Sequence, residues 1–203
     1  MSDEPMSDEQ WRCFVGVPIG EPLGGQLRDA VRPLRAAASA EADDLRWIDP
    51  TAWHLTLAFL GPTAMEEVPR LIEVLGQVAS DHAPFTIPTG GLGAFPSRRD
   101  VRILWFGLAD RSRRLAELAV AVRIAVNCET SSPFRAHLTL ARAHGDRGVA
   151  VPDTTWKVPM PAGQMPVEQL VLYRSHTGLG PASYEILAIA TLGLTLAGSR
   201  AAS

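Results

Sequence analysis

The sequence predicts an α+β fold with mainly antiparallel sheets. Segments with the periodicity of strands outnumber segments with the periodicity of helices by about seven to three. The strands do not alternate regularly with helices, which argues against a doubly wound parallel sheet. With 203 residues, 46% of them apolar and 20% charged, the chain is long enough to bury a core and is not collagen-like, low-complexity or wholly disordered.

The first half of the chain supplies strands and helices in turn. Residues 11–17 form the first predicted strand, which ends at a proline and a glycine. A stripe of apolar residues at helical spacing then predicts a helix over residues 23–38. Residues 47–50 are expected to form a short extended piece and a turn, and residues 54–60 the next strand. A second apolar stripe predicts a helix over residues 65–80.

The second half is richer in strands. Residues 85–88 are a predicted short strand, and the glycine-rich residues 90–93 after it are expected to form a bend. Residues 101–108 have the apolar character of a buried strand, and residues 111–127 that of a third helix. Three further strands are expected over residues 137–141, 167–175 and 184–194. A connection rich in glycine, proline and aspartate is expected over residues 144–166.

Charge divides the chain into an acidic tail and a near-neutral body. Residues 1–10 carry four acidic side chains and no basic one, and we expect them to be a disordered tail. Residues 11–198 are predicted to be one domain and residues 199–203 a C-terminal tail. After residue 10 the chain holds 18 acidic and 19 basic residues, within a total formal charge of −3. This balance argues against unselective binding of duplex nucleic acid.

The sequence predicts neither a membrane segment nor a metal site. Apolar runs fall short of the ~20 residues that a membrane helix needs, and the acidic N-terminus has no apolar signal core, so we expect a cytoplasmic protein. Cys13 and Cys128 do not have metal-binding spacing and are expected to be reduced. An acidic cluster of the kind that holds Mg²⁺ is also lacking, so no metal and no cofactor are expected.

One tetrapeptide, His-Leu-Thr-Leu, occurs twice, at residues 54–57 and 137–140. Both copies lie in predicted strands. Because residues i and i+2 of a strand share a face, each strand presents a histidine and a threonine on one face and two leucines on the other. A single His-x-Thr pair is more often structural than functional, but two copies in similar strands are hard to obtain by chance.

Two such strands facing each other would supply the groups that displacement at phosphorus requires. Imidazoles on either side of one atom can act as general base and general acid near neutral pH. Threonine hydroxyls can donate hydrogen bonds to oxygens of the bound group. A phosphoryl group can be transferred by this set of residues without a metal ion.

The sequence resembles the 2H phosphoesterases, a family named for two His-x-Thr-x motifs. Within that family it is most similar to the RNA 2′,3′-cyclic phosphodiesterases, which are also described as 2′-5′ RNA ligases. The likeness covers nearly the whole chain after the tail, and the segments that carry it are residues 14–18, 46–47, 54–61, 90–96, 102–105, 134–142 and 170–175. Two positions depart from the family pattern: Ala58 stands where lysine is frequent, and Ala136 where proline is frequent.

The resemblance implies a bilobal fold with pseudo-twofold symmetry, in which two mainly antiparallel sheets flanked by helices enclose a central cleft. It implies metal-independent opening of a 2′,3′-cyclic phosphate to a 2′-phosphate. His54 would be the proton donor to the departing 3′-oxygen and His137 the proton acceptor. Thr56 and Thr139 would bind the phosphate. The two histidines exchange roles if the reaction runs in the ligation direction.

Four further side chains are candidates for substrate binding. Strand alternation alone places Arg142 on the face opposite His137, whereas the family places the matching arginine on the substrate phosphate. Arg174 either adds charge near the cleft or braces a loop. Phe14 and Trp47 are candidates for stacking on a nucleotide base, although packing is the commoner role of such residues.

The expected substrates are RNA 3′ ends that carry a 2′,3′-cyclic phosphate, or cyclic nucleotides. We expect a monomer without an obligate protein partner or a membrane partner. Hydrolysis should dominate over 2′-5′ ligation, the reverse reaction, because water is abundant and no energy source is coupled. A nucleotide- or RNA-binding module without turnover is the alternative from another class, and the two intact histidines argue against it.

Overall fold

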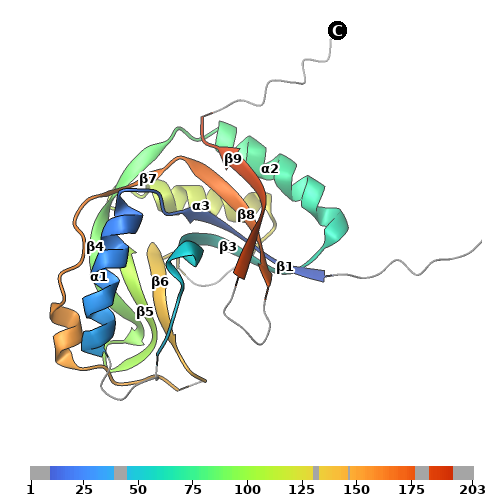
Figure 1. Ribbon diagram of the computed structural model, residues 1–203. Coiled ribbons are helices and arrows are strands. Elements are labelled where there is room, and N and C mark those ends of the chain that lie inside the picture. The colour runs from blue at the N-terminus through green and yellow to red at the C-terminus, as the bar shows by residue number, and fades with distance from the viewer. Residues whose placement is uncertain (1–9, 39–44, 130–132, 146, 177–182, 194–203) are drawn as a thin grey trace, which may run out of the picture.

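The residues that the structure describes fold around one antiparallel sheet of nine strands (Figure 1). The computed structural model describes residues 10–38, 45–129, 133–145, 147–176 and 183–193. The C-terminal tail and all but the last residue of the acidic N-terminal tail therefore lie outside the described residues. The strands are β1 Gln10–Pro18, β2 Leu45–Trp47, β3 His54–Ala64, β4 Phe85–Ser97, β5 Asp100–Leu108, β6 His137–Ala143, β7 Gln164–Val167, β8 Gln169–His176 and β9 Ser183–Thr191.

The two strands that carry the repeated tetrapeptide, β3 and β6, are neighbours at the middle of this sheet. The strand order is β7-β4-β5-β6-β3-β1-β8-β9, so three strands follow on either side of the central pair, and β2 pairs with β6. The only register pair between β3 and β6 in the described residues is Leu55 with Leu138. The α+β class and the antiparallel pairing are as predicted. The two expected sheets are two halves of one sheet, because this single pair joins them.

Three helices cover the sheet in the described part of the chain: α1 Leu23–Ala38, α2 Val68–Ser80 and α3 Arg114–Ala125. Helix α2 packs on β8 and β9, and α3 packs on β3 (Figure 1). Three short 3₁₀ helices complete the fold: η1 Pro50–Ala52, η2 Met65–Glu67 and η3 Asp153–Lys157. None of the described helices combines the length and apolar character that crossing a membrane requires.

Buried apolar side chains form two clusters on opposite faces of the sheet strands. The large cluster lies under the helices and includes the predicted stripe of α1, with Leu27 and Leu34 completely buried. The small cluster consists of Phe14, Val171 and Tyr173, with Tyr184 packed against it. The large cluster holds the sheet and helices together by burial of apolar surface, and the small one lies beside the first histidine.

The glycine-rich bend predicted at residues 90–93 is instead part of strand β4. The pairing of β4 with β5 is irregular between Thr89 and Leu92, which is where the glycines lie. A Cβ atom at Gly93 would overlap the ring of Trp105 on β5. The glycines therefore let two paired strands pass with a tryptophan ring against the backbone, which local turn propensity does not reveal. The strand predicted over residues 167–175 corresponds to β8, and β7 lies mostly in the connection expected over residues 144–166.

Candidate active site

The histidine and threonine of each motif face one cavity, and the leucines face the core. All four leucines of the motifs are completely buried. The cavity measures about 980 Å³ and is lined by the four polar side chains of the motifs, His54, Thr56, His137 and Thr139. The division into two faces that strand alternation predicts is therefore confirmed.

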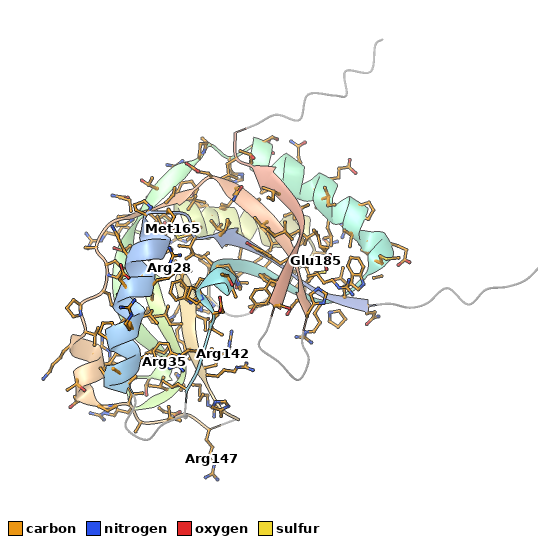
Figure 2. All side chains as sticks on the ribbon, in the orientation of Figure 1. Arg28, Arg35, Arg142, Arg147, Met165 and Glu185 are labelled. Atoms are coloured by element: carbon orange, nitrogen blue, oxygen red, sulfur yellow. The ribbon has the colours of Figure 1, made fainter. Side chains whose placement is uncertain are left out.

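A bulge in β6 brings Arg142 into the same cavity. Consecutive residues of β5 oppose Thr139 and Ala141, so Leu140 is an extra residue in β6. The bulge shifts the alternation by one, since Leu140 and Ala141 are both buried. Arg142 consequently lies on the face of Thr139 and lines the cavity, near the segment that joins β2 to η1 (Figure 2). Unbroken alternation would have placed it on the other face.

A matching bulge follows the motif in β3. Consecutive residues of β1 oppose Ala58 and Thr56, so Leu57 is the extra residue. Phe59 therefore occupies the position in β3 that Arg142 occupies in β6, and it lines the cavity with 66% of its surface exposed. The cavity is thus built symmetrically but ends in an aromatic ring on one side and a guanidinium on the other.

Each histidine ring is held by a backbone carbonyl two residues earlier in the chain. The Nδ1 atom of His54 lies 2.8 Å from the carbonyl oxygen of Ala52, and Nδ1 of His137 lies 2.7 Å from that of Arg135. A carbonyl oxygen only accepts hydrogen bonds, so Nδ1 carries the proton in both rings. Nε2 is then the nitrogen that is left to exchange a proton with a ligand.

Burial lowers the pKa of both histidines. The pKa of His54 falls to about 4, because burial disfavours the charged ring and the charges of Arg142 and His137 add to this, against a partial increase from the Ala52 carbonyl. The pKa of His137 is lowered by burial and by Arg142. Both rings are therefore uncharged at neutral pH in the protein alone. An anion beside Arg142 would favour a proton on either ring.

Aromatic rings enclose His54. Phe14 lies 4.6 Å from it between ring centroids, Tyr184 meets it edge-on at 5.0 Å, and Tyr173 lies at 5.7 Å. Gly16 makes room beneath the imidazole, since a Cβ there would lie 3.4 Å from its Cδ2 and 2.9 Å from the β3 backbone. This packing fixes the ring and removes water from one of its sides.

Two of the lining aromatic residues, Phe95 and Tyr184, were not singled out by the sequence. Phe95 on β4 meets His137 edge-on at 5.0 Å between ring centroids. Tyr184 on β9 is close enough to Arg142 to influence the pKa of the guanidinium. Phe95 lies in one of the segments that resemble the family, but without an expected role, and for Tyr184 the strand pattern was the only signal, which does not say which strands become neighbours.

Comparison with known proteins places the chain in a family. A family model described as "LigT like Phosphoesterase" matches residues 19–105. The RNA 2′,3′-cyclic phosphodiesterase of Bacillus subtilis is 30% identical over 191 residues, which are 89% of this chain and 97% of that protein. The protein of the same name from Thermus thermophilus is 32% identical over 179 residues, 81% of this chain and 82% of that protein. The chain belongs to the LigT-like phosphoesterase family.

Other members of the LigT-like family differ in length but share the fold. A Geobacillus stearothermophilus RNA 2′,3′-cyclic phosphodiesterase is 28% identical over 86% of this chain, but the match spans only 57% of that protein. The crystal structure of TT0787 from Thermus thermophilus has a TM-score of 0.73 at 25% identity and covers 90% of this chain and 98% of that one. The crystal structure of Escherichia coli LigT in complex with NADP⁺ has a TM-score of 0.67 at 25% identity. The match covers 92% of this chain and 100% of that one.

Phe14, Arg174 and Trp47 were the other candidates for substrate binding, and none of them is an exposed side chain of the cavity lining. Phe14 lines the cavity but is only 3% exposed, because it stacks on Tyr173 and lies against His54. Arg174 lies on the other face of β8, with its guanidinium 4.0 Å from the centre of the Trp11 ring. Its partner on β9 is Glu185, at 3.7 Å (Figure 2). Strand alternation separates Arg174 from the cavity-lining Ser175 beside it.

Trp47 lies in a separate groove of about 480 Å³ beside helix α1. Its neighbour Arg46, rather than Trp47, opposes Arg142 in the pairing of β2 with β6. Alternation then turns Trp47 toward α1, where Arg28 and Arg35 line the groove (Figure 2). The groove and the cavity share one lining residue, Ile48.

The donor set of the cavity is made of nitrogen and hydroxyl groups. Within the described residues, no group of three or more histidine, cysteine, aspartate or glutamate side chains is placed to hold a metal ion. Glu129 is the one carboxylate among the described lining residues. Cys13 also lines the cavity, but burial raises the pKa of its thiol, which makes it a poor nucleophile.

Proposed function

We propose that this protein hydrolyses the 2′,3′-cyclic phosphate of RNA ends or nucleotides to a 2′-phosphate, with His54 and His137 as its acid and base. The observation that carries the proposal is the pair of histidines in one cavity, each with Nδ1 fixed by a carbonyl and Nε2 left for proton transfer. The relatives named RNA 2′,3′-cyclic phosphodiesterase support this reaction. The nucleotide bound to Escherichia coli LigT supports a nucleotide in the cavity.

The reaction requires one proton to leave water and one to reach a ribose oxygen. Nε2 of the basic histidine takes a proton from the attacking water as the oxygen bonds to phosphorus. The bond from phosphorus to the 3′-oxygen breaks, and that oxygen takes a proton from the other histidine. Thr56, Thr139 and Arg142 donate hydrogen bonds to the remaining phosphate oxygens, on which negative charge increases in the transition state. The product is a 2′-phosphate with a free 3′-hydroxyl.

The difference between Phe59 and Arg142 orients the substrate. Arg142 attracts the phosphate toward the β6 side, and the exposed ring of Phe59 offers a stacking surface for a base on the β3 side. The ribose then lies nearer to His54, which donates the proton to the 3′-oxygen. His137 lies on the opposite side of the phosphorus and accepts the proton of water.

The substrate itself adjusts the protonation of His54. A pKa of about 4 leaves the ring uncharged at neutral pH in the protein alone. The anionic phosphate offsets the charge of Arg142 and stabilises the imidazolium. His54 therefore becomes an acid when the substrate is bound, whereas His137 needs to stay uncharged to act as a base.

The test is phosphorus NMR of the protein with 2′,3′-cyclic AMP and with a short RNA ending in a cyclic phosphate, in excess EDTA. His54→Ala and His137→Ala should each lose about 10²- to 10⁴-fold in rate. His82→Ala is a matched control, because Nδ1 of His82 also lies 2.7 Å from a backbone carbonyl but the ring is outside the cavity. It should convert both substrates at the wild-type rate.

Three results would contradict the proposal in different ways. A 3′-phosphate product would refute the orientation of the substrate. Loss of activity in EDTA would refute a mechanism that depends on the two histidines alone. Tight binding of the nucleotide without conversion by the wild type would make the protein a binding module.

A further inference from the structure

The cavity continues well beyond the two motifs, on the side of Phe59. Its lining includes four arginines and one glutamate: Arg12, Arg123, Arg135, Arg142 and Glu129. A cyclic mononucleotide carries a single negative charge, and Arg142 next to the threonines is sufficient to meet it. Arg123 donates to the Leu57 carbonyl and Arg135 lies over the Phe95 ring, so Arg12 is the lining arginine whose charge points to a second phosphate of the ligand.

Strand β1 carries a row of residues that leads from the catalytic centre to the rim. Phe14 and Arg12 line the cavity, and alternation along β1 places Gly16 on their face, because Val15 between Gly16 and Phe14 is buried in the core. Gly16 lies beneath His54. At about 3.3 Å per residue, Arg12 lies ~13 Å further along the strand. Its side chain is exposed and forms no ion pair within the part of the chain that the structure describes.

The opposite wall of this outer end is built on the open edge of β3. Because β3 leaves β6 after Leu55, its next carbonyls have no strand partner on that side. Nε of Arg123 donates to the carbonyl of Leu57 at 2.9 Å, and the Cys128 thiol donates to that of Phe59 at 3.1 Å. Phe59 thus lies on a fixed strand, and Arg12 from β1 and Arg123 from α3 line the same cavity.

We infer that this outer end, where Arg12 lies beyond the ring of Phe59, is a binding site for the nucleotide that precedes the cyclic phosphate terminus. Arg12 contacts the phosphodiester between the last two nucleosides. A basic groove that alternates with aromatic rings is the usual surface for single-stranded nucleic acid. The inference rests on the proposed function and adds to it a named contact beyond the terminal nucleotide, made by Arg12.

The test compares a dinucleotide with a mononucleotide. We define the dinucleotide preference as kcat/KM for adenylyl-adenosine 2′,3′-cyclic phosphate divided by kcat/KM for 2′,3′-cyclic AMP. For one partly exposed charge-assisted contact, the wild type should show a preference of about five- to tenfold. Arg12→Ala should reduce it to less than about twofold, and Arg12→Lys should retain part of it, because lysine keeps the charge but not the paired donors.

A neutral linkage tests the charge from the ligand side. A dinucleotide with a methylphosphonate between the nucleosides should lose the preference in the wild type and show no further loss in Arg12→Ala. Arg102→Ala is the matched control, since Arg102 is also an exposed arginine on a strand but lies outside the cavity lining. Its preference should equal that of the wild type.

The outcomes separate this inference from the proposed function. If the wild type cleaves cyclic AMP but shows no dinucleotide preference, the outer site is refuted and the proposed function is not. An equal effect of the methylphosphonate in wild type and Arg12→Ala also overturns it, because the phosphodiester is then bound elsewhere. If cyclic AMP is not cleaved at all, the proposed function fails. Calorimetric affinities for adenosine 2′-phosphate and its dinucleotide analogue, measured in wild type and Arg12→Ala, then decide the outer site.

Discussion

The lowered pKa of His54 makes the stability of the fold depend on pH in a defined window. The pKa is about 4 in the folded protein, against an ordinary value of 6.5. Between these values the unfolded chain binds a proton that the folded chain does not, so acidification favours unfolding. The resulting loss of unfolding free energy is absent above pH 6.5, grows as the pH falls, and is complete near pH 4.

The size of this effect follows from the two pKa values. One pKa unit corresponds to about 1.4 kcal/mol, so the full window is worth about 3 kcal/mol of unfolding free energy. Between pH 7.5 and pH 5 the loss is about 2 kcal/mol. Urea unfolding of wild type and His54→Gln at both pH values isolates it, because glutamine does not titrate and the other titrating groups are shared.

The expected result is that wild type loses about 2 kcal/mol more than His54→Gln on going from pH 7.5 to pH 5. Proton NMR of the His54 ring provides the second measurement, with a midpoint near 4 that moves upward in saturating phosphate. Equal pH dependence of the two proteins, together with a ring midpoint near 6.5, would refute the conclusion that burial governs this histidine.

Three more outcomes are expected. Arg142→Lys should lower kcat/KM for cyclic AMP by about 10- to 100-fold in steady-state assays, because lysine cannot make two parallel bonds to phosphate; full activity would exclude direct phosphate contact. Gly16→Ala should lower the melting temperature by about 2–12 °C and reduce kcat, because the new Cβ would lie 2.9 Å from the Leu55 carbonyl oxygen, next to His54. The pH profile of kcat/KM should have its maximum below pH 6.5, since one of two histidines with lowered pKa values must hold a proton. A rate that rises through pH 8 would contradict this.

The sequence by itself determined which side chains the two motif strands present to the cavity. Two copies of His-Leu-Thr-Leu in strands require that histidine and threonine share one face and that the leucines share the other. The buried leucines and the cavity-lining His54 and His137 agree with this. The three helices were predictable for the same reason, since side-chain periodicity along a strand or a helix is a local property of the backbone.

Strand periodicity does not say which residues join that centre, and the tertiary structure decides it; Arg142 is expected there from the family resemblance alone. Arg142 and Phe59 reach the cavity because each motif strand contains a bulge, and a bulge is a property of the pairing between two strands rather than of one. Tyr184 reaches His54 because β9 pairs with β8, far from either motif along the chain. Trp47 turns toward α1 instead, because β2 pairs with β6 in a register that presents Arg46 beside Arg142. Sequence patterns specify the faces of individual strands, but the register between strands is set by the packing of the whole sheet.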